Sequence, residues 1–500
     1  MPNETVKKKK SLLSRLTSER LSEMLKEIDV SAAGAVKEGE YTARARLTAL
    51  FDRGTFSETG RFMQRSSDPD GATGVITGYG SVDGRLCFAF AFDRSRMKGA
   101  FDASTGKKIA RLVRAAADNL SPVVGIFDSD GFSVFEGAPA LSAMGEVMSA
   151  LSEAGGLIPR VALVPGVCGG IEAALAASFD FMLTLSRPDG TGTDLFAVSP
   201  FLTGKSIDPA ADGLSCFCAA SEAELASAAC RLISLLPSSS RDIPAAAPHD
   251  EAEESRAPDI TGLYGFPLIG EISDAGASFP LYRGFSDGLA LALARVGGVC
   301  CLIVAGDRST GGGALTGNGC DSLVKALRFA DCFGIPAVYL TDSTGIPGSG
   351  VYTGDGAPAP ADTGATYLNS LSALSAAVAA FSAPVVTLYT GRAYGAGYIL
   401  LGSKALGADI VYALPDACIS ALSPESSVAF IWNEKIKAGD LDSSREMLER
   451  EWKEDHSPAE AALSGDIDDI VSPAGARPKI VSALYMLLGR DRGEKSRRNR

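Results

Sequence analysis

Two glycine-rich turns are the parts of this 500-residue chain best suited to chemistry. The first contains Gly169 and Gly170, and the second contains Gly395, Ala396 and Gly397. Each turn follows an apolar run typical of a β-strand and precedes a run typical of a helix. Such a turn exposes backbone N–H groups at a helix N-terminus, where they can hold an oxyanion. The alternative is that tight packing alone requires glycine there.

Histidines and cysteines offer little for catalysis or metal binding. The sequence has two histidines, His249 and His456, which limits histidine-based proton transfer and metal sites. None of the ten cysteines belongs to a Cys-x-x-Cys pair, so neither a zinc ribbon nor a thioredoxin motif is predicted. We therefore expect no metal, and we interpret most cysteines as buried thiols of a reducing compartment.

A serine hydrolase is an alternative hypothesis. Residues 284–288 fit the G-x-S-x-G pattern with Ser286 as the nucleophile, and the partner would be His456 because it is the histidine that follows. The hypothesis requires a helix that begins near Leu289. The competing interpretation is a simple turn.

The acidic composition restricts the classes of partner. Lys and Arg number 47 against 60 Asp and Glu, and the net charge of −13 argues against nucleic-acid binding. Hydrophobic residues make up 46% of the chain, enough for large cores. The apolar run from Leu289 to Ala305 is interrupted by Arg295 and two glycines, so it predicts core strands and not a membrane span. The N-terminus lacks the apolar run of a signal peptide, so we expect a soluble, cytoplasmic protein.

The elements that position the two turns occur twice along the chain. A predicted helix, a buried strand that starts at a proline and an Asp-Ser-x-Gly turn recur at a constant separation of 214 residues, as in Asp128 and Asp342 and in Gly131 and Gly345. Downstream, each copy has a strand, the glycine turn, a helix, an acidic residue and another strand. We therefore predict two copies of one α/β domain. Convergent α/β patterning is the alternative interpretation.

This repetition divides the chain into five predicted segments. A helical arm (1–40) precedes a first domain (41–237), and a linker rich in proline, serine and acidic residues (238–258) leads to a second domain (259–490). A basic tail (491–500) follows.

Together these motifs resemble the carboxyltransferase subunits of biotin-dependent acyl-CoA carboxylases and decarboxylases. The relatives include the β subunit of propionyl-CoA or acetyl-CoA carboxylase, the large subunit of methylmalonyl-CoA transcarboxylase and the α subunit of sodium-pumping acyl-CoA decarboxylases. The resemblance covers about residues 41 to 488 and rests on segments in both halves: Ala43–Phe56, Gly74–Gly84, Pro122–Ser129, Arg392–Gly395 and Ser403–Asp409.

The resemblance implies a fold and an activity. The fold is a tandem pair of crotonase-like (ClpP/crotonase) α/β domains, each a ββα-superhelix, with the acyl-CoA side in the first and the carboxybiotin side in the second. The activity is transfer of a carboxyl group between carboxybiotin and the α-carbon of a short-chain acyl-CoA, such as propionyl-CoA or methylmalonyl-CoA, through an enolate. Gly169 and Gly170 would hold the enolate oxygen, and Ala396 and Gly397 would polarise the ureido oxygen of biotin. Further substrate-binding residues would be Lys98, Gly99, Gly131, Gly345, Gly395 and Ile399.

The resemblance also implies partners. The sequence has no Met-Lys-Met or Met-Lys-Leu biotin-attachment motif, so biotin would be carried by a separate biotin carboxyl carrier protein. A biotin carboxylase subunit or a membrane decarboxylase pump subunit would complete the system, and the resemblance implies a homo-oligomer, namely a homohexamer. The reverse, decarboxylating direction and a weakened scaffold subunit remain alternatives.

The first domain departs from the family pattern. Asp130, Phe132 and Ser133 replace residues of a usual Asp-Ser-Gly-Gly-Ala-Arg segment, and Asp130 puts a carboxylate near an anionic CoA. Basic residues could instead contact the CoA phosphates, and Lys107 and Lys108 are the candidates at a predicted helix start, although solvated charge is the favoured interpretation. Gly204-Lys205-Ser206 does not fit a phosphate-binding P-loop, because Ser199 stands where that loop needs glycine, so Lys205 is interpreted as a surface residue or a CoA-phosphate contact.

Overall fold

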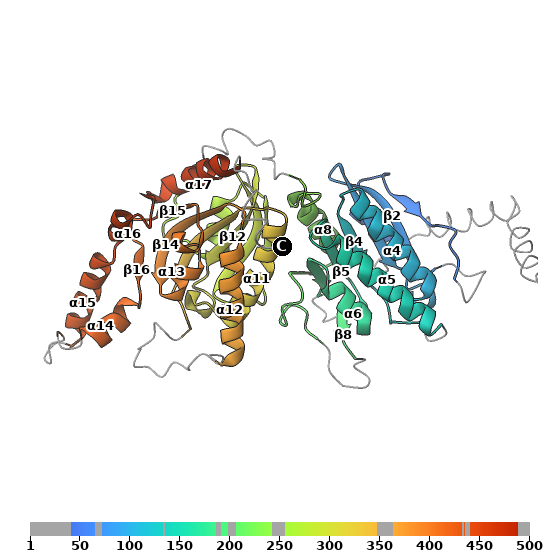
Figure 1. Cartoon of the computed structure of the whole chain (residues 1–500), viewed down its shortest axis with the longest axis horizontal. Coiled ribbons are helices and arrows are strands. Elements are labelled where there is room, and N and C mark those ends of the chain that lie inside the picture. Colours follow the sequence, from blue (N-terminus) through green and yellow to red (C-terminus); the bar gives the residue numbers. More distant parts are fainter. Residues whose placement is uncertain are drawn as a thin grey trace, which may run out of the picture.

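The computed structural model describes most of the chain (Figure 1). The described residues are 42–65, 73–133, 136–186, 192–198, 207–242, 256–347, 364–432, 435 and 441–488. The predicted arm (1–40) and basic tail (491–500) lie outside these ranges, as does most of the predicted linker. The domain boundaries therefore stay predictions.

The first half of the described chain is built around a mixed sheet of seven strands. The strands β1, β2 and β3 are antiparallel, and β3, β4, β5, β7 and β9 continue the sheet in parallel. A separate parallel pair, β6 and β8, lies at the carboxyl end of β5. The strands are β1 Ser57–Thr59, β2 Val75–Val82, β3 Arg85–Phe92, β4 Val123–Ile126, β5 Arg160–Val164, β6 Val167–Gly169, β7 Phe181–Leu185, β8 Asp194–Phe196 and β9 Phe217–Ala219, and the helices are α3 Ala43–Leu50, α4 Ala103–Asp118, α5 Ala138–Ala154, α6 Gly170–Ala177 and α8 Glu222–Leu235.

The second half repeats this plan around a sheet of eight strands. An antiparallel trio, β10 to β12, leads into the parallel strands β13, β14, β15 and β17, and β16 pairs with the far end of β14. The strands are β10 Ser278–Leu281, β11 Leu289–Val296, β12 Val299–Gly306, β13 Ala337–Ser343, β14 Val385–Tyr394, β15 Ile410–Ala413, β16 Cys418–Ser420 and β17 Asp469–Ile470, and the helices are α10 Gly265–Ile272, α11 Gly317–Cys332, α12 Ala365–Ala380, α13 Ala396–Leu400, α14 Pro424–Ile431, α15 Leu441–Asp455, α16 Pro458–Ser464 and α17 Pro473–Leu488.

The predicted duplication is confirmed at the level of single residues. The bounds of β2 and β11, of β3 and β12, and of α4 and α11 are all separated by the 214 residues found in the sequence. Hydrogen bonds repeat as well, because Phe101 N donates to Gly131 O at 2.9 Å and Leu315 N donates to Gly345 O at 2.8 Å. Convergent patterning would not produce equal spacing in both elements and contacts, so the two halves are copies of one fold.

The sequence pattern predicts helices that begin at Lys107 and Asp321, and in the structure both helices begin four residues earlier. The helix α4 begins at Ala103 because the side chain of Asp102 caps it by accepting from Thr105 N, and α11 begins at Gly317 because Thr316 caps it in the same way. The first turns of both helices carry small and polar residues, which hide a helical period. The apolar run from Leu289 forms the hairpin β11–β12, as the composition predicted.

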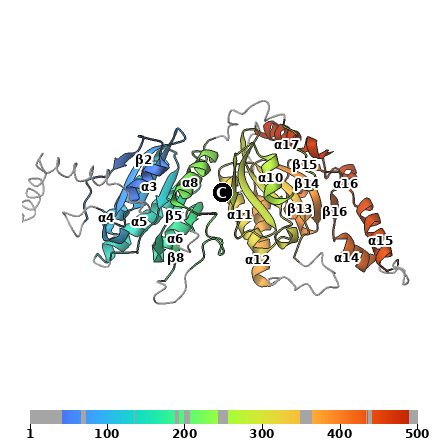
Figure 2. The ribbon, with the colours of Figure 1, turned by 180° about the vertical axis from the view of Figure 1, so that it is seen from behind.

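The two halves share a hydrophobic core where α8 faces α11 (Figures 1 and 2). The rings of Phe181 and Phe329 meet across this junction with centroids 4.6 Å apart. Backbone contacts join the same faces, since Tyr282 N donates to Cys216 O at 2.8 Å. Burial of apolar side chains therefore holds the two copies together within one chain. Across the described residues, helices fall short of the length and apolar character that a bilayer crossing would need.

Candidate active site

The first glycine turn joins β6 to α6 and permits no side chain at its centre. A Cβ atom at Gly169 would lie 2.1 Å from the ring of Phe196 on the neighbouring strand β8. Gly170 has φ of +63°, a conformation that side chains disfavour. Steric contact and backbone conformation therefore both require glycine, and α6 begins directly at this turn.

Other predicted residues of the first half gather around this turn. Ser129, at the end of β4, donates its N–H to Val167 O at 2.8 Å. The next residue, Asp130, donates to Lys98 O at 3.2 Å, and a Cβ atom on Gly99 would lie 2.7 Å from Asp128 O. The loop that contains Gly131 therefore contacts β6, which leads into the glycine turn, and the 3-10 segment Met97–Gly99 packs against the same loop.

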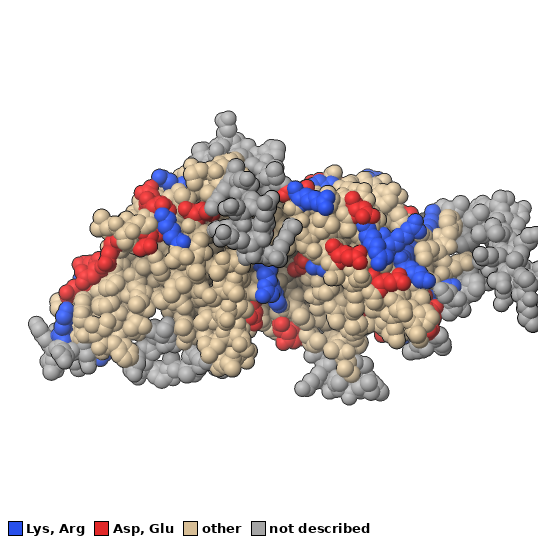
Figure 3. Space-filling model, viewed as in Figure 1, with Lys and Arg blue, Asp and Glu red and all other residues tan. Residues whose placement is uncertain are grey.

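The unusual carboxylate of Asp130 is paired with two cations. Its oxygens lie 2.9 Å from Arg94 Nη1 and 3.6 Å from Lys98 Nζ. More widely, Lys and Arg side chains gather beside Asp and Glu over one face of the first half (Figure 3). The charge that would oppose an anionic ligand is therefore largely balanced by its neighbours.

The second glycine turn follows β14 and brings together four predicted residues. Gly395 has φ of +47°, and α13 begins at Ala396. A Cβ atom on Gly345 would lie 2.6 Å from Tyr394 O, and one on Gly397 would lie 2.8 Å from Oγ and Cβ of Ser343. The fifth residue, Ile399, is 50% exposed on α13, so half of its side-chain surface is accessible to a ligand.

A glycine triplet in the second half escaped the sequence prediction. Gly311–Gly313 forms a 3-10 segment that is the counterpart of Met97–Gly99, and Thr344 N donates to Gly313 O at 3.2 Å, one position further along than the acceptor Lys98 O of Asp130 N. The signal was available, because Gly312 and Gly313 follow Lys98 and Gly99 by the same 214 residues. In both halves, therefore, a 3-10 segment contacts the loop that follows the central strand.

The strand pairing in each half shows which residues of the two glycine turns are equivalent. Ser129 forms a bridge with Cys168, and the matching Ser343 pairs with Ala393. Counting onward from these bridges, Gly170 corresponds to Gly395, and both have positive φ. Ala396 and Gly397 correspond to positions 171 and 172 of the first half, so the four predicted oxyanion residues are not equivalent position for position.

A buried aspartate anchors each site at the end of the central strand. Asp128 accepts from Arg46 Nη1 at 2.6 Å and from Arg94 Nη1 at 3.2 Å. Its counterpart Asp342 accepts from Arg392 Nε at 2.7 Å and also from Arg308. Both carboxylates bond the backbone of the strand that leads into the glycine turn, which fixes the position of that turn.

The hydrolase hypothesis is wrong because a strand, β11, begins at Leu289, where a nucleophile elbow needs a helix. The hydroxyl of Ser286 donates to Leu289 O at 2.9 Å. The ring of His456 stacks on that of Trp452 with centroids 4.2 Å apart, so His456 is held by α15, the helix that contains Trp452. The turn interpretation therefore stands for Ser286.

The favoured interpretation of Lys108 as solvated charge is also wrong. Its side chain is buried, and Nζ donates to Val75 O at 2.9 Å and to Thr73 Oγ1 at 3.4 Å. Burial lowers the pKa of this ammonium to about 8. Lys107, one position earlier, is exposed, while Lys205 lies outside the described residues.

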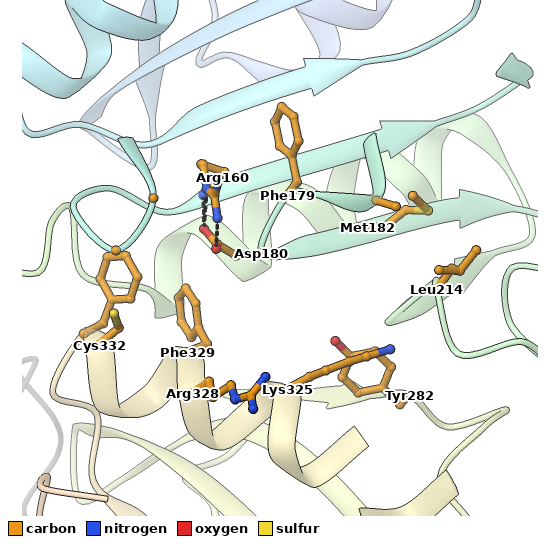
Figure 4. Close-up of a pocket in the computed structure, with 14 residues that line it drawn as sticks. Arg160, Phe179, Asp180, Met182, Leu214, Tyr282, Lys325, Arg328, Phe329 and Cys332 are labelled. Atoms are coloured by element: carbon orange, nitrogen blue, oxygen red, sulfur yellow. Dashed lines mark hydrogen bonds and ion pairs between the residues drawn. The ribbon is translucent and has the colours of Figure 1, made fainter. Parts of the chain in front are cut away.

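A cavity of about 390 Å³ lies at the junction of the halves (Figure 4). Its wall includes the ion pair of Arg160 and Asp180 from the first half and Lys325 and Arg328 from α11. None of the predicted oxyanion or substrate-binding residues lines it. The cavity is therefore separate from both glycine turns.

Comparison with known proteins identifies the family. The model of the family described as "Carboxyl transferase domain" matches residues 35–500. The chain belongs to this family. The carboxyltransferase is 30% identical over 486 residues to methylmalonyl-CoA decarboxylase subunit alpha of Propionigenium modestum, with 90% of this chain and 91% of that protein covered. It is 28% identical over 490 residues to the propionyl-CoA carboxylase carboxyltransferase subunit of Haloferax mediterranei, with 92% and 93% covered.

A solved structure supports the same conclusion for the fold. Transcarboxylase 12S, a hexamer assembly with methylmalonyl-CoA and methylmalonic acid bound, has a TM-score of 0.81 and 27% identity, and 94% of each chain is covered. The predicted crotonase-like α/β fold is confirmed for this carboxyltransferase.

Proposed function

We propose that this carboxyltransferase moves a carboxyl group between biotin on a separate carrier protein and the α-carbon of a short-chain acyl-CoA. The observation that carries the proposal is the pair of matched glycine turns. Each half also has a 3-10 segment and a buried aspartate near its turn. The names of the relatives, which include propionyl-CoA and methylmalonyl-CoA, favour acyl groups of that size.

The first turn is proposed to hold the thioester oxygen as the enolate forms. The first N–H groups of a helix have no acceptor within it, and the helix dipole favours negative charge at that end. Gly169 and Gly170 precede and begin the eight-residue helix α6, so their N–H groups are suited to this task. Arg94 and Lys98, which pair with Asp130, would reduce the repulsion between this carboxylate and an anionic CoA nearby.

The second turn is proposed to bind the ureido oxygen of biotin. The tight contacts of Gly345 and Gly397 with neighbouring backbone and Ser343 create a cradle that a Cβ atom would fill, which suits close approach of a flat polar group. Ala396 and Gly397 would supply its N–H donors. Biotin, when bound, supplies the transferable carboxyl group and an acceptor for the α-proton.

The direction of transfer remains open between two proposals, because one relative is named a carboxylase subunit and another a decarboxylase subunit. Carboxylation would require a biotin carboxylase partner, and decarboxylation would require a membrane pump partner. A homohexamer is proposed by analogy with transcarboxylase 12S. The exposed apolar residues Phe430 and Ile431 on α14 offer surface for such an assembly.

The test is a transfer assay with purified protein. Methylmalonyl-CoA labelled in its free carboxyl group is mixed with a biotinylated carrier protein, and label on the carrier is measured with and without avidin. We expect avidin-sensitive transfer, and malonyl-CoA serves as a second donor to compare acyl groups. Binding of CoA thioesters without any transfer would favour the scaffold alternative instead.

A further inference from the structure

A buried carboxyl group lies directly behind the first glycine turn. Glu172 is the third residue of α6, and its relative exposure is 0%. Among the described residues, neither of its carboxyl oxygens has a partner with hydrogen-bond geometry. Buried carboxylates are ordinarily paired, so an unpaired one at this position calls for a neutral, protonated state.

Within the part of the chain that the structure describes, no Lys or Arg forms an ion pair with Glu172. Burial raises its pKa to about 7, the nearby Ser129 hydroxyl lowers it, and Asp130 raises it. The other titratable neighbour is the buried thiol of Cys168, whose own pKa is raised by burial and then by Glu172 and Asp128. Two cations, Arg94 and Lys98, pair with the neighbouring Asp130.

The second half shows that the fold does not need this group. Glu172 lies four residues beyond Cys168, which is bridged to Ser129, and Gly397 lies four residues beyond Ala393, which pairs with Ser343. A side chain at Gly397 would collide with Ser343. The carboxyl group is therefore present at the first site alone and is not part of the structure that the two halves share.

We propose that Glu172 acts as a neutral carboxylic acid beneath the first oxyanion turn, and that its ionisation weakens enolate stabilisation there. A second negative charge at the rear of the turn would oppose the developing oxyanion, and low dielectric would strengthen that repulsion. Since the side chain has no exposed surface, Glu172 is a positioning residue that acts through the turn. The inference rests on the proposed function.

The test is the pH profile of turnover between pH 6 and pH 8.5 in the transfer assay. We expect wild-type kcat to fall by about tenfold as Glu172 ionises, whereas Glu172→Gln keeps its pH 6 rate across the range. The matched control is Glu146→Gln, which changes an exposed glutamate on α5 and should retain the wild-type profile. If Glu172→Gln follows the wild-type profile, or is folded but inactive at pH 6, the inference is overturned.

Two further readouts separate this inference from the proposed function. Absence of carboxyl transfer by the wild-type protein at every pH would refute the function itself. Should Glu172→Gln fail to fold, infrared titration of the wild-type protein decides, because a protonated-carboxyl band that is present at pH 6 and lost by pH 8.5 supports the inference. Lack of that band at pH 6 would contradict it.

Discussion

The two halves of this carboxyltransferase have the same backbone arrangement around their glycine turns but differ in the charged side chains near those turns. In each half the loop at the end of the central strand contacts a 3-10 segment on one side and the strand that leads into the glycine turn on the other, and a buried aspartate lies at the strand end. In the first half Asp128 is held by Arg46 from the distant helix α3, whereas in the second Asp342 is held by Arg392 from the adjacent strand β14. The backbone geometry has thus been kept while the electrostatics diverged.

This divergence fits two different ligands. In the second half Gly397 stands at the position that matches Glu172 and is tightly packed against Ser343, which agrees with the neutral ureido group that we propose for this site. The first turn has Glu172 beneath it and Asp130 with its two cations beside it, so its electrostatics can respond to pH and to an anionic CoA. Duplicated backbone donors can therefore serve different chemistry when the groups behind them change.

The largest effect is expected from removing one backbone donor of the second turn. Ala396→Pro deletes an N–H at the first helical position, where proline is tolerated. We expect kcat for transfer to fall by roughly 10²–10³-fold, as for loss of an oxyanion donor. Ala396→Ser, which keeps the N–H, should stay near wild type, and equal losses in both variants would contradict the assignment.

The equivalent substitution in the first half tests which residues of the two glycine turns correspond in function. Position 171 corresponds to position 396, so Ile171→Pro removes the counterpart donor from α6. If the register governs the chemistry, this variant should lose transfer to a similar degree, measured with saturating acyl-CoA. Unchanged kcat would instead leave Gly169 and Gly170 as the donors.

Removal of the strand-end carboxylates tests the difference between the halves in stability. Asp128→Ala leaves the largely buried Arg46 with Glu222 as its ion-pair partner and removes the acceptor of Val167 N, so it should lower the free energy of unfolding by about 2 to 3 kcal/mol. Asp342→Ala leaves the more exposed Arg308 and Arg392, which water can solvate, so about 1 to 2 kcal/mol is expected. Urea unfolding measures both, and a larger loss for Asp342→Ala would reverse the comparison.

Glu172 should also make stability depend on pH. Its folded pKa of about 7 lies above the ordinary value of 4.5, so the folded state favours the protonated form. The resulting stability is present below pH 4.5 and is lost as pH rises through about 7. The free energy of unfolding of Glu172→Gln, measured relative to that of the wild type, should therefore increase by about 2–3 kcal/mol between pH 5 and pH 8.5. A pH-independent difference in thermal unfolding would mean that Glu172 is solvated.

The smallest effect is expected at Asp130. Asp130→Asn removes a partly exposed partner of Arg94 and Lys98, which should change stability by less than about 1 kcal/mol. The freed cations should lower KM for the acyl-CoA by about twofold, and Asp118→Asn on α4 is the exposed control. A KM decrease of tenfold or more would show that Asp130 strongly opposes CoA despite its partners.

The local pattern of the sequence was enough to predict the duplicated fold and both glycine turns. The constant separation of Asp128 and Asp342 and of Gly131 and Gly345 reflects strands and turns whose residue types are set by short-range geometry. The glycines at 170 and 395 are required by positive φ, a property of the local backbone. Features of this kind leave a signature within a few residues of the chain.

Only the tertiary structure decided which charged groups are paired, buried or left alone. Lys108 is buried because β2 supplies Val75 O as its partner, and Asp130 is balanced because Arg94 and Lys98 approach from another loop. The isolation of Glu172 beneath the first turn likewise depends on packing between segments far apart in sequence. The energy of a charge depends on every neighbour within several ångströms and on the loss of water, and neither quantity is set by residues adjacent in the chain.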